Sequence, residues 1–111
     1  MQRIISTGEN RICLCAPVKA ELWYGACKSQ RIAENQASLI RLFDDFPSLP
    51  FDDEAALRLG DIRAQLARRG TPIGPYDLQI AAIAVAHGLT VVTHNTREFS
   101  RVPGLMLEDW L

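Results

Sequence analysis

The sequence predicts one α/β domain over residues 1–111, with helices on both faces of a parallel sheet. Two observations predict this fold. Short apolar runs with the length of buried strands alternate along the chain with longer segments of helical spacing. The 48% hydrophobic content is enough for a core, and the sequence contains no repeat, low-complexity tract or linker that would divide it.

The first half of the chain is predicted to begin its regular structure with a strand followed directly by a helix. Residues 11–16 form a continuous apolar run typical of a buried strand, and Pro17 begins a helix that extends to about Ala26. Residues 31–46 place apolar side chains at helical spacing. Pro47 is expected to end that second helix.

A short strand at residues 49–51 is predicted to precede a long helix. Asp52 or Asp53 is expected to cap this helix, because a carboxylate oxygen can accept a hydrogen bond from the N–H groups of the first turn. Gly70 should end it. Its buried face is predicted to consist of apolar residues that recur about one turn apart: Ala56, Leu59, Ile62, Leu66 and Ala67.

The segment that follows is the most informative part of the sequence. Residues 71–77 read Thr-Pro-Ile-Gly-Pro-Tyr-Asp, so a loop stiffened by two prolines delivers the Asp77 carboxylate into the first turn of a helix. Pro75 suits the first position of that helix, and Gly88 suits its end. The remaining predicted elements are a buried strand at residues 89–93, a short helical turn and a last strand at residues 105–107.

Charge and motifs limit the possible functions. With a formal net charge of −1 the chain has no general basic character, so any contact with a nucleic acid must come from a local patch. The sequence contains no G-x-x-x-x-G-K-[ST], no G-x-G-x-x-G and no nucleophile elbow. Nucleotide hydrolysis and serine chemistry are therefore poor explanations of this sequence.

The cysteines and the apolar runs predict a cellular location. Cys13, Cys15 and Cys27 are an odd number and lack a C-x-x-C or paired-histidine context, so they are expected to be reduced core thiols. The longest apolar stretches fall short of the ~20 residues that cross a bilayer. We therefore expect a cytoplasmic protein with no membrane contact and no signal peptide.

Glu21 and Asp77 are predicted to bind a divalent cation. Glu21 lies about one turn after the first strand, and Asp77 begins a helix near the carboxyl ends of the strands, where open α/β sheets place their sites. Carboxylate oxygens suit Mg²⁺ and Mn²⁺, and such ions activate water for phosphodiester hydrolysis. Each acid also has a simpler explanation, since Asp77 could only stabilise its helix N-terminus and Glu21 could only be solvated.

Polar residues after the strand at 89–93 are candidates for the same catalytic site. Asn95 is expected to position water or to turn the chain, and Glu98 to bind the cation through water or to pair with Arg97 or Arg101. For other residues a structural role is the main expectation and a functional role is the alternative. These are Thr93 as a hydrogen-bonding group, His94 as a base, the arginines 63, 68, 69, 97 and 101 as phosphate contacts, and Trp23, Tyr24 and Trp110 as base-stacking residues.

Four segments together closely resemble a PIN-domain ribonuclease of the VapC toxin type. They are Ala20–Ala26, Gly70–Asp77, Ala86–Thr93 and the stretch from Asn95 through Gly104 to Trp110, so the resemblance covers nearly the whole chain. It implies a three-layer α/β/α fold and a metal-dependent endoribonuclease. It also implies that the protein is the toxin of a toxin–antitoxin pair, with RNA as substrate, a VapB-like antitoxin as inhibitor and a homodimeric state.

The sequence also differs from that family. VapC-like proteins begin with a central hydrophobic strand that ends in Asp-Thr/Ser-Asn, whose Asp is a metal ligand, and this sequence lacks it. Residues 1–10 look like the tail of the following helix, as after a misassigned start or a truncation. We therefore expect one acidic ligand and the central strand to be missing, with poor activity and poor monomer stability. A second hypothesis is an inactive remnant that binds an antitoxin or dimerises.

Overall fold

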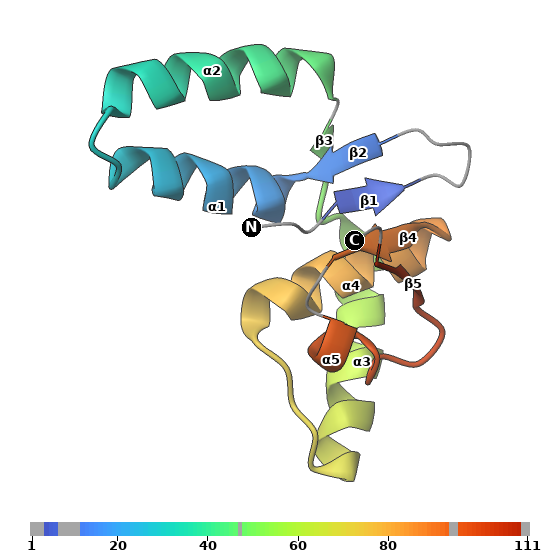
Figure 1. The fold of residues 1–111 in the computed structure, drawn as a ribbon. Coiled ribbons are helices and arrows are strands. Elements are labelled where there is room, and N and C mark those ends of the chain that lie inside the picture. The colour runs from blue at the N-terminus through green and yellow to red at the C-terminus, as the bar shows by residue number, and fades with distance from the viewer. Residues whose placement is uncertain (1–3, 7–11, 47, 94–95, 110–111) are drawn as a thin grey trace.

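The computed structural model describes residues 4–6, 12–46, 48–93 and 96–109 (Figure 1). Its elements, in chain order, are β1 (Ile4–Ser6), β2 (Ile12–Cys15), α1 (Ala16–Cys27), α2 (Ile32–Asp45), β3 (Ser48–Leu49), α3 (Asp53–Arg69), α4 (Pro75–His87), β4 (Thr90–Val92), α5 (Thr96–Phe99) and β5 (Met106–Glu108). Within these ranges, no helix is both long and apolar enough to cross a membrane. The alternation of strands and helices confirms the predicted α/β class.

The sheet has the strand order β3-β2-β1-β4-β5. β2 pairs with β3 and β4 pairs with β5 in parallel, as predicted, whereas β1 is antiparallel to both of its neighbours. Ile5 lies opposite Cys13 on one side and Val91 on the other. The sheet is therefore mixed, with its one reversed strand at the centre.

β1 corrects two expectations about the start of the chain. The helix tail predicted for residues 1–10 is wrong at Ile4–Ser6, which form a strand. That strand also supplies a ladder at the centre of the sheet, where a ladder was expected to be missing. The sequence Ile-Ile-Ser at positions 4–6 has two residues of a type enriched in strands.

Helix α4 is the centre of the hydrophobic core. It packs along α3 and also contacts α1, α5 and β4. Leu78 and the whole run Ile80–Ala84 are buried, so α4 has buried apolar residues on nearly every side. A helix of this kind belongs between other elements. Its alanines let the neighbouring backbones approach closely.

Both ends of α3 follow the predicted capping signals. Asp52 is the N-cap residue, and its Oδ1 atom accepts a hydrogen bond from the Ala55 N–H group at 2.9 Å. Gly70 ends the helix in the left-handed conformation, with φ of 68°. This is the αL geometry in which glycine avoids the steric penalty of a Cβ atom.

The buried face of α3 differs partly from the predicted one. Ile62 and Leu66 are buried and Leu59 is partly buried, as expected, but Ala56 and Ala67 are exposed. Ala55 takes the place of Ala56 in the core. The buried residues Ala55, Leu59, Ile62 and Leu66 are spaced three or four positions apart, which is the helical repeat. The predicted face began at Ala56, one position too late.

The short strands end a residue or two away from their predicted positions. β3 covers Ser48–Leu49 and not 49–51, and the Phe51 side chain is 40% exposed. β5 begins at Met106, one residue later than predicted. Short strands lack the capping signals that define helix ends, so sequence gives their limits less sharply.

Helices α1 and α2 form a hairpin that extends away from the sheet (Figure 1). Lys19 joins the two helices near the sheet: its Nζ atom donates a hydrogen bond to the Phe46 carbonyl at 2.8 Å and lies 5.1 Å from the centre of the Phe43 ring. A lysine that binds a carbonyl just beyond a helix C-terminus is also favoured by the helix dipole.

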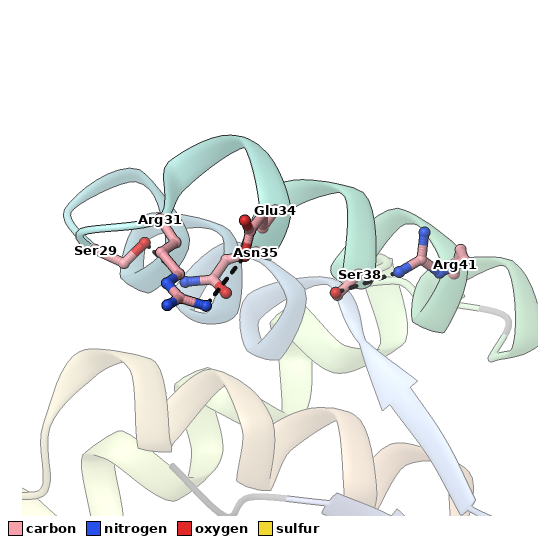
Figure 2. Close-up of polar contacts among 6 residues, drawn as sticks. All are labelled: Ser29, Arg31, Glu34, Asn35, Ser38 and Arg41. Atoms are coloured by element: carbon pink, nitrogen blue, oxygen red, sulfur yellow. Dashed lines mark hydrogen bonds and ion pairs between the residues drawn. The ribbon is translucent and has the colours of Figure 1, made fainter.

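The outer helix of this hairpin, α2, contains no buried residue. Figure 2 shows polar contacts along it, including the Asn35 amide, which donates to Ser29 Oγ at 2.9 Å. Arg31 pairs with Glu34 at 3.5 Å, and Arg41 donates to Ser38 at 3.4 Å. Because these groups are exposed, their contacts add little to stability.

Replacing the α3 cap should destabilise the domain measurably. Asp52→Ala should lower the free energy of unfolding by about 1 kcal/mol, because the Ala55 N–H group loses its acceptor. Asp53→Ala is the matched control, since Asp53 lies in the same turn without being the N-cap residue. Urea unfolding followed by circular dichroism measures both. Equal losses in the two variants would contradict the capping role.

Candidate metal and catalytic site

The carboxyl ends of four strands meet along one edge of the sheet. β2 and β3 are parallel, β4 and β5 are parallel, and β1 runs antiparallel between β2 and β4, so the four outer strands all point the same way. Their last residues are Cys15, Leu49, Val92 and Glu108. Open α/β sheets bind their ligands at this edge.

Asp77 reaches this edge through the start of α4. Gly74 is the N-cap residue, Pro75 follows it as predicted, and the Leu78 N–H group donates to the Gly74 carbonyl at 2.9 Å to close the first turn. At its other end α4 stops at Gly88, with φ of 65°, and the chain returns at once into β4. The helix therefore runs back along β4, and its N-terminus lies toward the carboxyl end of that strand.

The Asp77 side chain is buried, with only 5% of its surface exposed. Its Oδ1 atom accepts no hydrogen bond from the described residues, although Asp77 does have another polar or electrostatic contact. Taking a carboxylate out of water is costly unless nearby positive charge or hydrogen-bond donors compensate. The N–H groups at the start of α4 provide part of that compensation and favour the ionised form.

Glu21 lies in the second turn of α1, which begins directly after β2. The side chain is half-buried, and α1 packs against α4, the helix that carries Asp77. The charge of Glu21 is felt by the Cys15 thiol at the end of β2. Glu21 and Asp77 are thus held by packed helices that both begin near the same edge of the sheet.

Cys15 is completely buried beside this edge. Burial raises the pKa of the Cys15 thiol to about 11, backbone groups of Val18 and Cys15 lower it, and the Glu21 carboxylate adds to the rise. The thiol is therefore protonated and unreactive at neutral pH. Cys27 differs from its prediction as a core residue: it is exposed at the end of α1, where the helix leaves the core.

The structure places some of the other predicted site residues near this edge. Thr93 directly follows β4, is buried, and its N–H group donates to the Glu108 carbonyl at 3.0 Å. Glu98 lies on α5 with a half-buried side chain. Asn95 and His94 lie outside the described residues, so their predicted roles stay predictions.

Two acidic residues at this edge were not selected from the sequence. Glu108 is the last residue of β5 and Asp109 follows it, and both are exposed. Their position directly after the last parallel strand was the available signal, because the same reasoning selected the polar residues after β4. The Glu108 carbonyl accepts the hydrogen bond from the Thr93 N–H group, which joins the ends of β4 and β5.

The donor chemistry of the site fits a hard divalent cation. In the described part of the chain, no three or more histidine, cysteine, aspartate or glutamate side chains cluster closely enough to form a complete metal site. Glu21 and Asp77 nevertheless offer carboxylate oxygens, which suit ions that keep several water ligands and need few protein groups. The buried thiol of Cys15, being protonated, is a poor ligand.

The remaining residues considered for a functional role lie away from the strand ends or contact other parts of the fold. His87 Nε2 lies 3.7 Å from Asp52 Oδ2, so the residue joins the end of α4 to the start of α3. Tyr24 is 66% exposed, and its ring lies 4.9 Å from the Lys28 ammonium group. The side chains of the arginines at positions 63, 68 and 69 project from exposed positions of α3.

The chain belongs to the PIN domain family, whose model matches residues 2–105. PIN-domain nucleases generally depend on divalent metal ions. Within this family the similar curated proteins are VapC ribonucleases, which confirms the resemblance drawn from the sequence.

Two relatives illustrate the similarity. The chain is 46% identical over 101 residues to the tRNA(fMet)-specific endonuclease VapC of Salmonella typhimurium, covering 91% of this chain and 76% of that protein. It is 38% identical over 101 residues to ribonuclease VapC2 of Rickettsia felis, covering 91% of this chain and 75% of that protein.

Solved structures agree with the sequence comparison. The DNA-bound VapBC complex of Salmonella typhimurium matches with a TM-score of 0.87 and 46% identity, over 91% of this chain and 76% of the solved chain. VapBC2 of Rickettsia felis, bound to a promoter DNA fragment, matches with a TM-score of 0.86 and 37% identity, over 93% and 77% of the respective chains.

Cys15 and Cys27 should differ sharply in reactivity. At pH 8, Cys27 should react quickly with a thiol reagent, whereas Cys15 should react only after unfolding, because its raised pKa keeps the buried thiol protonated. The pKa of Cys15 in the folded protein lies above the ordinary value of 9.0. The stability that the protonated thiol contributes to the fold is therefore present below pH 9 and is lost as the pH rises toward 11. Peptide mass mapping after timed labelling measures each site; equal labelling of both in the native protein would contradict the assignment.

Proposed function

We propose that this chain is a divalent-metal-dependent endoribonuclease and the toxin of a VapBC-type toxin–antitoxin pair. The observation that carries the proposal is the match to VapC ribonucleases over more than nine-tenths of the chain, at up to 46% identity in the relatives described above. The buried carboxylate of Asp77 at the ligand-binding edge of the sheet is the chemical feature that the activity requires.

Glu21 and Asp77 are the residues that we propose hold the ion, which is Mg²⁺ or Mn²⁺. When bound, such an ion supplies an activated water and absorbs the charge that develops on the phosphate. Asp77 contributes a carboxylate that lies at the N-terminus of α4 and that burial shields from bulk water. Glu21 contributes a second negative charge from the packed helix α1.

Asn95 and Glu98 are proposed to complete the catalytic site. Glu98 lies on the short helix α5 directly after the segment that follows β4, so its carboxylate is available to orient a water or an ion-bound water. Asn95 offers an amide that can donate to or accept from such a water. Neither group needs to ligate the ion directly for this role.

The substrate is proposed to be RNA. The relative from Salmonella typhimurium is named for its action on tRNA(fMet), which makes an initiator tRNA the first substrate to test. Exposed arginines, among them Arg97 on α5, provide local positive charge beside the acidic edge of a chain whose formal net charge is −1. Phosphate contacts from such groups give affinity that decreases with salt.

A VapB-like antitoxin and a second copy of the chain are the proposed protein partners. The solved structures that match this chain are VapBC complexes. On this chain, α2 has no fully buried residue and exposes the apolar side chains Ile32, Ile40 and Leu42. We propose that part of this exposed apolar surface meets the protein partner. The alternative of an inactive binding remnant has no specific observation in its favour.

Removing either proposed ligand should abolish cleavage. Asp77→Asn and Glu21→Gln should each lower Mn²⁺-dependent cleavage of initiator tRNA at least about 100-fold, because the neutral amide attracts the ion less strongly than the carboxylate. Glu34→Gln is the control, since Glu34 is an exposed acid on α2. Rates are measured on this chain and on a version extended by the in-frame codons upstream of Met1. Cleavage by both ligand variants at the control's rate would refute the site.

The exposed Ile40 side chain on α2 should contribute to antitoxin binding. Ile40→Glu should weaken binding of a VapB-like antitoxin at least tenfold, because a carboxylate would have to be desolvated in the interface. Arg41→Gln, at the neighbouring exposed position, is the control. Isothermal titration calorimetry measures the dissociation constants, and circular dichroism verifies the fold. Equal affinities for the two variants would place the antitoxin elsewhere.

A further inference from the structure

We propose that Arg101 is a positioning residue for the nuclease site: it tethers the loop that delivers Asp77. The Nη1 atom of Arg101 donates a hydrogen bond to the Pro72 carbonyl at 3.1 Å, across 29 positions of sequence. This inference rests on the proposed function for its catalytic consequence. The tether itself is a property of the fold that can be measured separately.

The loop before α4 has few hydrogen bonds of its own. At its start the Thr71 N–H group donates to the Leu66 carbonyl at 3.0 Å, and at its end the Leu78 N–H group donates to the Gly74 carbonyl at 2.9 Å. Pro72 and Pro75 have no N–H group to donate. Two contacts hold the middle of the loop: the Ile73 side chain packs against the core, and the Arg101 guanidinium binds the Pro72 carbonyl, two positions before the N-cap residue of α4.

Arg101 itself projects from a firmly packed segment. Its neighbours Phe99 and Val102 are buried in the core, at 0% and 5% exposure. Its own N–H group donates to the Glu98 carbonyl at 3.1 Å, and Val102 donates to the Phe99 carbonyl at 3.1 Å. One end of the tether is thus fixed to the core, and the same turn carries Glu98 of the proposed site.

The geometry joins the two halves of the site. On one side of the tether lies α5 with Glu98, and on the other lies the loop that sets where α4 begins and hence where the Asp77 carboxylate stands. A shift of the catalytic group by about 1 Å can cost up to ~100-fold in rate. Loss of the tether should therefore lower turnover without removing any group that touches the substrate.

A phosphate contact is the competing role for Arg101, and kinetics separate the two. We compare Arg101→Met and Arg101→Lys with Arg58→Met, which removes a guanidinium whose partners Glu54 and Asp61 lie on its own helix. For Mn²⁺-dependent RNA cleavage, Arg101→Met should lower kcat about tenfold with KM changed less than about twofold. Arg101→Lys should recover part of kcat, because an ammonium group can also donate to the carbonyl.

Hydrogen–deuterium exchange supplies a readout that does not need activity. The peptide covering residues 70–78 should exchange faster in Arg101→Met than in the wild type or in Arg58→Met. Unchanged exchange in this peptide would overturn the proposal, as would a raised KM and a weaker salt dependence with unchanged kcat, which indicate a phosphate contact. If neither this chain nor the version extended upstream of Met1 cleaves RNA, the proposed function fails, while faster exchange in Arg101→Met still supports the tether.

Discussion

The packing of α4 between α3 and β4 is the constraint on which the rest of the structure depends. Burial of Ile80 and Ile83 stabilises the fold by roughly 1.5–3 kcal/mol for each side chain and holds the helix between its neighbours. The position of the helix in turn sets where Asp77, in its first turn, lies. The hydrophobic core thereby determines where a charged group stands at the edge of the sheet.

The two proposed ligands have different kinds of support. Asp77 is held by a helix that is buried on nearly every side, and its loop is tethered from the α5 turn. Glu21 is held by α1, whose partner in the hairpin, α2, buries no residue. Lys19 compensates in part, because its hydrogen bond and ring contact join α1 to the end of α2 near the sheet. The precision of the site therefore depends on side chains that do not belong to it.

Local signals allowed much of this fold to be predicted. Asp52, Gly70, Pro75 and Gly88 each determine a helix end through the backbone next to them, and all four predictions are confirmed. The direction of β1 could not be predicted, because strand pairing depends on partners distant in sequence. The phase of α3 was wrong at Ala56, where alanine gives a weak signal for burial.

The choice of Glu21 and Asp77 as metal ligands stays a prediction. Their positions after a strand and at a helix start, together with the resemblance to PIN-domain ribonucleases, selected them, and the structure places the helices that carry them near the carboxyl ends of the strands. The tether from Arg101 to Pro72 was not predictable, since a long flexible side chain can reach many acceptors and only the packed fold selects one. Glu108 ends and Asp109 follows a strand of only three residues, whose end the sequence does not define sharply, so their position at the same edge was not predicted.

The exposure of α2 also sets the order in which the molecule opens. α2 has no fully buried residue and meets the core through the partly buried Phe43, so separating it exposes less apolar surface than exposing α4. We therefore expect α2 to open before α4, and proteolysis of the native protein to begin there. Any molecule that binds the hairpin in its folded form suppresses that opening by mass action, and so lengthens the life of the chain in the presence of proteases.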